Sequence, residues 1–177
     1  LSTSIRGERS AKSPELPARV VTHGPHTVVI AGTGAGPDAE AAARALGAPL
    51  LAEVASGARF GPNLVPAFRE LLRDPDFGGK VERAIVFGHP TLSREIPALI
   101  ERDDVETIVV RSPGVDDYNP GRRVSEFADA IEVEGDSDDR AWPGSWVHAS
   151  RQLLEQDEPL GAGPETEQFA ERAAFAR

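Results

Sequence analysis

Three closely spaced glycines, followed later by a glutamate, have the spacing of a dinucleotide-binding loop. The apolar run Thr27–Ala31 leads into Gly32, Gly34 and Gly36, and Glu53 lies 21 residues after Gly32. In dinucleotide-binding domains such a loop lets the backbone approach a pyrophosphate, and the acid accepts hydrogen bonds from the ribose hydroxyls. One interpretation is therefore a site for NAD, FAD or ADP, formed by this loop and Glu53.

The residues after the glycines favour a second interpretation, in which the loop is only a tight turn. Pro37 stands where the last glycine of G-x-G-x-x-G should be, and it has no N–H to offer a phosphate. Asp38 and Glu40 place two carboxylates at the positive end of the following helix, where a pyrophosphate would have to approach. Glycine is also needed for tight strand-to-helix geometry without any ligand. Both interpretations stay open on these residues.

A second stretch, Phe87–Ile100, has the makings of an anion site. Pro97 lacks an amide hydrogen and is tolerated only in the first turn of a helix, so the helix begins at most a few residues before it. Arg94 therefore lies at the amino end of that helix, where a cation opposes the helix dipole. A visiting anion would explain this placement, and so would an ion pair with Glu95 or another surface acid.

Strand-like and helix-like patterns alternate along the chain and must position these residues. Strands are predicted from short β-branched runs, and helices from apolar residues spaced three and four apart. The predicted strands are Thr27–Ala31, Pro49–Ala52, Ala84–Phe87, Val105–Val110 and Ala130–Val133, and the predicted helices are Asp38–Leu46, Leu64–Arg73, one containing Ile96–Ile100, and a closing helix capped by Ser145. Such alternation implies an α/β fold of three layers, a mostly parallel open sheet with helices on both faces.

Composition divides the chain into three parts. Residues 1–25 are rich in Ser, Pro, Arg and Lys without periodicity and are predicted to be a linker from an upstream domain. Residues 26–135 are predicted to form the α/β domain, and 136–177 a closing helix and a connector to a downstream domain. The sequence contains no methionine and so does not begin at its own start codon. We therefore expect it to be part of a longer protein.

Charge and residue usage disfavour several functions. The formal net charge of −10, from 29 acids and 19 bases, opposes binding to nucleic acid or to an anionic membrane. The absence of cysteine removes thiolate chemistry and fits a cytoplasmic location. No apolar stretch is long enough to cross a bilayer. His23, His26 and His148 form no cluster with carboxylates at metal-ligand spacing, so no metal site is expected in this chain.

Three segments are similar, in order and spacing, to the central domain of one enzyme family. They are PLLAEVASGARFG (Pro49–Gly61), FGHPTLSREIPALI (Phe87–Ile100) and DDYNPGRR (Asp116–Arg123). From about Thr27 to Trp146 the chain thereby resembles 2-succinyl-5-enolpyruvyl-6-hydroxy-3-cyclohexene-1-carboxylate synthase, a thiamine diphosphate enzyme of menaquinone biosynthesis. The most specific match is P-x-L-A-E-x-x-S-G-x-R, which begins at Pro49.

The resemblance implies a parent enzyme of three domains with similar topology. The first and third domains, from two subunits, hold thiamine diphosphate with Mg²⁺ or Mn²⁺. The middle domain, which this chain resembles, has a dinucleotide-type sheet to which no cofactor is assigned. The whole enzyme, at least a dimer, is expected to decarboxylate 2-oxoglutarate and add the succinyl unit to isochorismate. This chain alone is expected to bind no cofactor and to be inactive.

The resemblance also implies roles for a few residues. A basic residue at the position of Arg94 reaches toward isochorismate in the family, so Arg94 is the expected substrate-binding residue, and no catalytic residue is expected in this chain. Some members bind a downstream dihydroxynaphthoate as a feedback inhibitor through arginines. The matching positions here are His89 and Val115, with Arg111 and Arg59 nearby as substitutes, so this effector site departs from the family's pattern.

Two functions of other classes stay open beside this one. The first is a self-contained nucleotide-binding protein that uses the Gly32–Gly36 loop and Glu53. The second is an interaction domain that assembles through its sheet edge or its helices. Binding of NAD, FAD or ADP that is lost in Glu53→Ala would favour the first, and an oligomer seen by light scattering would favour the second.

Overall fold

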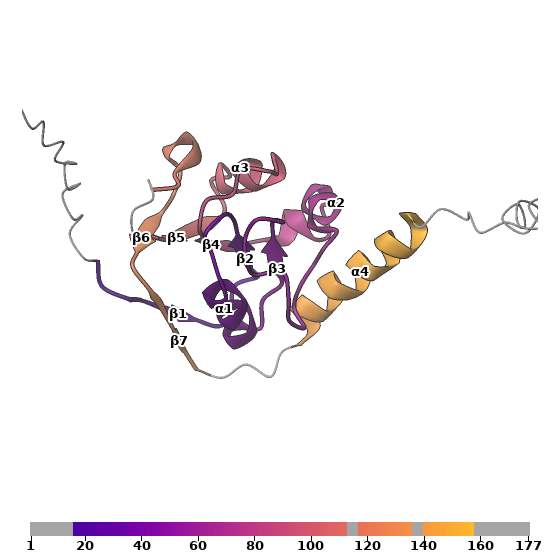
Figure 1. Ribbon diagram of the computed structural model, residues 1–177, viewed down its shortest axis with the longest axis horizontal. Coiled ribbons are helices and arrows are strands. Elements are labelled where there is room, and N and C mark those ends of the chain that lie inside the picture. Colours follow the sequence, from indigo (N-terminus) through magenta and orange to yellow (C-terminus); the bar gives the residue numbers. More distant parts are fainter. Residues whose placement is uncertain (1–15, 113–116, 136–139, 158–177) are drawn as a thin grey trace, which may run out of the picture.

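The structure, a computed structural model, describes residues 16–112, 117–135 and 140–157 (Figure 1). Its strands are β1 (Arg19–Thr22), β2 (Thr27–Ala31), β3 (Leu50–Ala52), β4 (Arg83–Phe87), β5 (Glu106–Val110), β6 (Glu126–Ala128) and β7 (Ile131–Glu134). Its α-helices are α1 (Asp38–Leu46), α2 (Phe68–Arg73), α3 (Glu95–Ile100) and α4 (Ala141–Asp157), with short 3-10 turns at Gly78–Lys80 and Pro120–Arg122.

The main sheet has five parallel strands in the order β3-β2-β4-β5-β6. The sequence of β2, TVVIA, is buried at all five positions. A continuous β-branched run is what a strand covered on both faces requires, because neither set of alternating side chains meets water. The predicted α/β fold with a parallel open sheet is confirmed.

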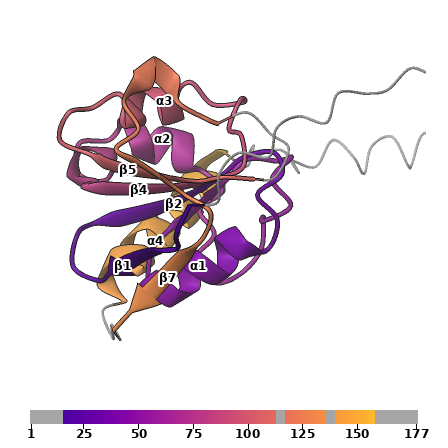
Figure 2. The same cartoon turned by 90° about the vertical axis from the view of Figure 1, so that its left-hand side faces the viewer.

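Side chains of the sheet alternate between two hydrophobic cores, which define the outer layers. Val28 and Ile30 of β2 pack in one core with residues of α2, α3 and α4. Val29 and Ala31 point the other way and pack in a second core with α1 and, at its border, β7. Figure 2 shows α2 and α3 on one side of the sheet and α1, β1 and β7 on the other. Helices therefore cover both faces, as predicted, and a small pair of strands shares one face with α1.

Helix α1 has the predicted bounds and ends at the predicted glycine. Gly47 adopts φ +59°, and its N–H donates to the carbonyls of Ala43 and Arg44, which closes the helix in the left-handed conformation that glycine favours. The buried Asn63 side chain then donates to the carbonyls of Ala43 and Ala48, both at 3.0 Å. The carbonyls at this helix end are thus satisfied by one backbone turn and one side chain.

Helix α2 is shorter than predicted, since it begins at Phe68 and not at Leu64. The preceding residues are extended beside β3, where the Val65 N–H donates to the Leu50 carbonyl at 3.0 Å. Pro66 explains the difference, because the residue before a proline is sterically pushed out of the helical region. Phe68 and Leu71 are buried in α2, whereas Leu64, predicted to begin the helix, is partly buried and lies in the extended segment.

The amino-terminal linker and the last strand need correction together. Residues 19–22, expected to be linker, form β1, which pairs in parallel with β7 in a separate two-stranded sheet. Strand β7 corresponds to the predicted Ala130–Val133, but it does not join the main sheet, and the edge strand β6 was not predicted. In β1 Val21 is buried between the exposed Val20 and Thr22, but two adjacent valines hide this alternation in the sequence.

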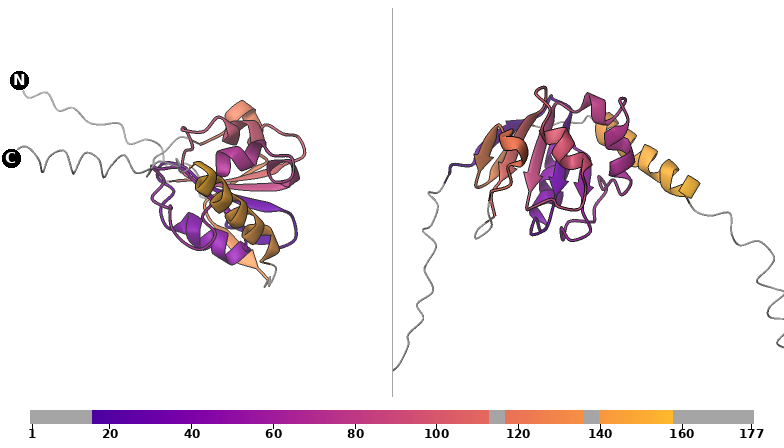
Figure 3. Two further views of the ribbon diagram at one scale, coloured as in Figure 1. Left: turned by 90° about the vertical axis from the view of Figure 1, so that its right-hand side faces the viewer. Right: turned by 90° about the horizontal axis from the view of Figure 1, so that it is seen from above.

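Helix α4 begins before the predicted cap and packs on the domain. It starts at Ala141, so Ser145 lies inside the helix, where its hydroxyl donates to the Trp142 carbonyl at 2.8 Å. The Trp142 indole N–H donates to the Thr27 carbonyl at 2.8 Å, and its ring stacks on His26. Trp146 is fully buried. Figure 3 shows α4 along the side of the domain that carries α2.

Candidate functional site

The sheet brings three loops together at the carboxyl ends of its strands. Because β3, β2 and β4 are neighbours, the loops that follow them, residues 53–59, 32–37 and 88–94, share one edge. In open α/β sheets this is the edge at which ligands bind. The glycine loop, Glu53 and the segment that leads to Arg94 therefore lie where the sequence placed them.

The amides of the glycine loop are occupied by the protein's own backbone. Four of them donate to main-chain carbonyls at 2.9–3.1 Å: Gly32 to Phe87, Thr33 to His89, Ala35 to Gly32, and Gly36 to Ser56. Pro37, the N-cap of α1, has no amide hydrogen. A phosphate cradle needs several N–H groups aimed at one point outside the loop. These amides are aimed at neighbouring strands and loops instead.

Two of the glycines are required by the close contact between the loops after β2 and β4. A Cβ on Gly32 would lie 2.1 Å from the Pro90 nitrogen, closer than real Cβ atoms approach. A Cβ on Gly88, which has φ +68°, would lie 2.5 Å from the Thr33 carbonyl oxygen. By contrast Gly34 and Gly36 have positive φ but open space around them. Gly32 is therefore required because a side chain there would clash with a neighbouring loop. Gly34 and Gly36 are favoured because their backbone has positive φ.

Glu53 is buried, with 2% of its surface exposed, and its carboxylate binds the loop after β4. Its two oxygens accept hydrogen bonds from the N–H groups of Thr91 at 3.0 Å and Leu92 at 2.9 Å. Glu53 has the position of the acid that holds the ribose in a dinucleotide site, yet here its oxygens hold main-chain amides. The structure places Glu53 beside the glycine loop but directs it to a different partner.

The motif that begins at Pro49 is explained by the turn it forms around Glu53. The Ser56 hydroxyl accepts a hydrogen bond from the Ala58 N–H at 3.1 Å, and Gly57 has φ +71°. The Arg59 guanidinium donates back to the carbonyl of Ala52, the last residue of β3, at 3.2 Å. Serine, glycine and arginine thus close the turn that presents the glutamate.

Arg94 is the N-cap residue of α3, as the position of the following proline predicted. Its side chain is 88% exposed, and its Nε lies 3.5 Å from a carboxylate oxygen of Glu95. That contact is long, and an ion pair that involves so exposed a guanidinium contributes little to stability. The Arg94 guanidinium therefore faces solvent at the edge of the sheet where the three loops meet.

Glu95 is engaged by a second arginine that sequence reasoning did not single out. Arg73 of α2 donates to Glu95 through its Nε, at 3.0 Å, and through a second nitrogen. Burial raises the pKa of Glu95, but the hydrogen bonds and charge of Arg73, a backbone hydrogen bond and Arg94 together hold that pKa below its usual value. Arg69, one turn earlier, donates to the Leu92 carbonyl at 3.0 Å. Arg69 and Arg73 are four residues apart and so lie on one face of α2, and this spacing was the sequence signal for a shared role.

The three residues suggested for an effector site follow three different strands, His89 after β4, Arg111 after β5 and Arg59 after β3. His89 stacks edge-on against Tyr118, with ring centres 4.9 Å apart. Arg111, after β5, pairs with Asp129, whose pKa is lowered by the Leu16 N–H and by this guanidinium. Arg59 bonds the end of β3, and β2 and β4 separate that strand from β5. Val115, the fourth position considered, lies outside the described residues.

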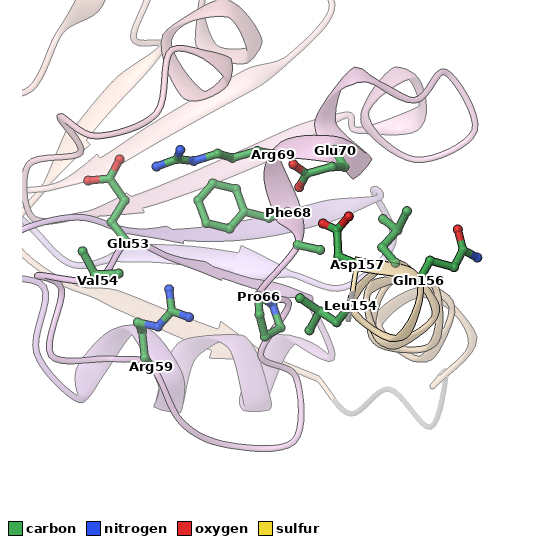
Figure 4. A pocket seen from close by; sticks show the side chains of 12 residues that line it. Glu53, Val54, Arg59, Pro66, Phe68, Arg69, Glu70, Leu154, Gln156 and Asp157 are labelled. Atoms are coloured by element: carbon green, nitrogen blue, oxygen red, sulfur yellow. The ribbon is translucent and has the colours of Figure 1, made fainter. Parts of the chain in front are cut away.

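A cavity of about 400 Å³ adjoins the loop edge between α2 and the carboxyl end of α4. It is lined by Glu53, Val54, Arg59, Pro66, Ala67, Phe68, Arg69, Glu70, Leu153, Leu154, Gln156 and Asp157. In Figure 4 the side chains of Glu53 and Arg69 extend toward the same region, beside the ring of Phe68. Both acids and arginines line this space, so it has no single sign of charge.

Two kinds of site are not found in the described ranges. Among residues 16–112, 117–135 and 140–157, no three His, Asp or Glu side chains gather as metal ligands would. Within the same residues no helix has the length and apolar content needed to span a bilayer. Four amides of the glycine loop already have backbone partners, so few of them are open to a pyrophosphate.

The fold and the loop edge define the class of protein. It is a three-layer α/β domain with a parallel open sheet, in which backbone hydrogen bonds of the chain itself occupy the loop between β2 and α1. No family model matches the chain.

Curated relatives identify the family. The chain is 62% identical over 143 residues, 78% of its length, to a protein of Leifsonia xyli subsp. xyli. It is 52% identical over 167 residues, 88% of its length, to one of Clavibacter michiganensis subsp. michiganensis, and 42% identical over 179 residues to one of Arthrobacter sp. (strain FB24). Each is named 2-succinyl-5-enolpyruvyl-6-hydroxy-3-cyclohexene-1-carboxylate synthase.

The chain belongs to this synthase family, as the similarity of its three segments indicated. It spans 24%, 28% and 30% of the lengths of these three relatives. The match therefore covers less than a third of each of these relatives.

Proposed function

We propose that this chain is the non-catalytic central domain of a synthase that decarboxylates 2-oxoglutarate and adds the succinyl unit to isochorismate in menaquinone biosynthesis. In this proposal thiamine diphosphate and Mg²⁺ or Mn²⁺ belong to other domains of the same protein, which works as a dimer or a larger homo-oligomer. The central domain contributes scaffold, contacts to those domains and one basic side chain directed at substrate.

The observation that carries this proposal is that backbone carbonyls of the chain itself bind the amides of the loop between β2 and α1. The amides of Gly32, Thr33 and Gly36 donate to carbonyls of other loops and strands. The Glu53 carboxylate is likewise committed to two loop amides. A nucleotide would have to displace these bonds, and each broken bond would leave a protein group without its partner. This geometry supports a structural use of a nucleotide-type sheet.

The proposed role of Arg94 rests on its exposure at the same edge. Isochorismate is a dicarboxylate, and a guanidinium binds carboxylates through directed, charge-assisted hydrogen bonds. The neighbouring arginines Arg59, Arg69 and Arg73 each donate to the protein itself. The 88% exposure of the Arg94 side chain supports a contact beyond the domain.

Two experiments on the chain alone test the structural part of this proposal. With thiamine diphosphate and Mg²⁺, the chain should not turn over 2-oxoglutarate and isochorismate, and turnover would overturn the proposal. In a thermal-shift titration, NAD, FAD and ADP should leave its melting temperature unchanged. A stabilising shift that disappears in Glu53→Ala would favour the self-contained nucleotide-binding protein instead.

A third experiment, on the full-length synthase, tests the substrate contact. Arg94→Ala should raise the KM for isochorismate by about tenfold, the effect of losing a charged hydrogen bond. Arg94→Lys, which keeps a cation, should retain most of the affinity. Arg44→Ala, on α1, is the matched control, because Arg44 is exposed and pairs with Glu40 of its own helix. An unchanged KM in Arg94→Ala would make Arg94 an ordinary surface residue.

A further inference from the structure

The segment that carries Arg94 is bound by a buried acid from the loop after β3, a strand separated from β4 by β2. Glu53 follows β3, and its two carboxylate oxygens accept the N–H groups of Thr91 and Leu92 at 3.0 and 2.9 Å. At 2% exposure the carboxylate is shielded from water, so these bonds have little competition from solvent. Leu92 lies two residues before Arg94.

Helix α2 binds the same segment through two arginines. The guanidinium of Arg69 donates to the Leu92 carbonyl at 3.0 Å, and Arg73 binds the carboxylate of Glu95. Glu53, Arg69 and Arg73 therefore form a clamp, in which an acid takes the amides and two arginines take the acceptors. The clamp fixes residues on both sides of Arg94.

Arg94 is the member of this segment that the clamp leaves out. Its side chain is 88% exposed and has only a long, 3.5 Å approach to Glu95 among its charged contacts in the described structure. A long flexible side chain loses rotamer freedom when it binds, so its starting position and the rigidity of its backbone decide much of its affinity.

We propose that Glu53 is a positioning residue: by binding the amides of Thr91 and Leu92 it sets where Arg94 stands, and thereby the affinity of the synthase for its dicarboxylate acceptor. This inference rests on the proposed role of Arg94. Glu53 contacts the loop backbone, and it acts on the substrate only through that loop. The glutamate at the ribose position of a dinucleotide-type sheet thus has a different use here.

Glu53→Gln tests the inference with little change of shape. Glutamine has one oxygen where glutamate has two, so one loop N–H would face an NH₂ group and lose its acceptor. In the full-length synthase we expect the KM for isochorismate to rise about fivefold, as for the loss of one hydrogen bond, while the KM for 2-oxoglutarate stays unchanged. Hydrogen exchange at Thr91 and Leu92 should become faster.

The double variant Glu53→Gln with Arg94→Ala separates positioning from general weakening. If Glu53 acts through Arg94, the double variant has the same KM for isochorismate as Arg94→Ala alone. If the two effects multiply, the inference is wrong. Glu40→Gln is the matched control, because Glu40 is another buried acid, 7% exposed, whose partner Arg44 lies on α1. It should change neither KM nor exchange at Thr91 and Leu92.

Further outcomes keep this inference distinct from the proposed function. If Arg94→Ala raises the KM and Glu53→Gln does not, only the positioning role falls. If Arg94→Ala has no effect, the proposed substrate contact falls and the positioning role falls with it. Should Glu53→Gln fail to fold, Arg69→Gln, on an exposed residue of α2, tests the same clamp. Its expected KM rise must also vanish in the Arg94→Ala background.

Discussion

Thr33 and His89 exchange both of their backbone hydrogen bonds, with the Thr33 N–H 3.1 Å from the His89 carbonyl and the His89 N–H 2.9 Å from that of Thr33. This antiparallel bridge joins the loop after β2 to the loop after β4. A loop that binds nucleotides must leave its amides free, whereas here the amides join two loops. In the loop between β2 and α1, the amide of Thr33 is therefore used to bind another loop and not a ligand.

Gly32→Ala should destabilise the chain by about 1–3 kcal/mol, the usual cost of overpacking a close contact. The added Cβ would lie 2.1 Å from the Pro90 nitrogen and 2.3 Å from the His89 carbonyl carbon, and both are backbone atoms that cannot rotate away. Urea unfolding measures the loss. Gly144→Ala is the control, because that glycine lies in α4 with nothing within 4 Å of its added Cβ. It should be neutral or stabilising, and equal stability of both variants would refute the contact.

Asn63→Ala should lower the free energy of unfolding by about 1–3 kcal/mol. The Asn63 amide donates to the carbonyls of Ala43 and Ala48 at the end of α1, and the residue is only 8% exposed. Without it two carbonyls lose a donor in a place that water does not readily reach. Asn119→Ala is the control, since the exposed Asn119 accepts one bond from the Val124 N–H. A loss as large as that of Asn63→Ala in this control would contradict the prediction.

The most accurate predictions from the sequence were those of strands and helices whose residue pattern is complete within one short segment. The run TVVIA in β2 and the alanine-rich helix up to Gly47 have local patterns that packing then reinforces. The position of Arg94 followed from one proline, because a missing amide hydrogen limits a helix start regardless of the rest of the fold. These predictions needed no knowledge of distant residues.

What the sequence left undetermined depends on pairs far apart in the chain. Strand β1 exists because β7 lies beside it, more than one hundred residues later, and its own four residues have no clear pattern. The partner of Glu53 is likewise set by the parallel order β3-β2-β4, which brings residues 38 and 39 positions away to its oxygens. The two interpretations of the glycine loop differ in such long-range bonds, so local spacing could not separate them.

Ser150→Ala should destabilise the docking of α4, again by about 1–3 kcal/mol. The Ser150 hydroxyl, fully buried, accepts a hydrogen bond from the Ala67 N–H at 3.0 Å, and alanine would leave that amide without an acceptor. Ser145→Ala is the control on the same helix. Its hydroxyl is exposed and donates back to its own helix, so alanine should be neutral or slightly stabilising. Urea unfolding followed by tryptophan fluorescence compares them, because both tryptophans lie in α4.

Tyr118, the only tyrosine in the sequence, offers a direct electrostatic test. Burial, with the nearby charges of Glu53 and Glu101, raises the pKa of its phenol to about 12. The unfolded chain should titrate near 10, the ordinary value for tyrosine. Because the folded pKa is the higher one, the unfolded state releases the Tyr118 proton first as the pH rises. The contribution of Tyr118 to the free energy of unfolding is therefore constant below about pH 10 and decreases as the pH rises toward 12.

Phenolate absorbance after a rapid pH jump measures this pKa in the folded chain, and the same titration in urea gives the reference. Glu53→Gln should lower the folded value, because it removes one of the negative charges that oppose ionisation of Tyr118. Glu40→Gln, on the opposite face of the sheet, should leave it unchanged. A folded titration near 10 in the unmodified chain would mean that Tyr118 is open to water, and that the packing between its ring, His89 and the loop after β4 is not as described.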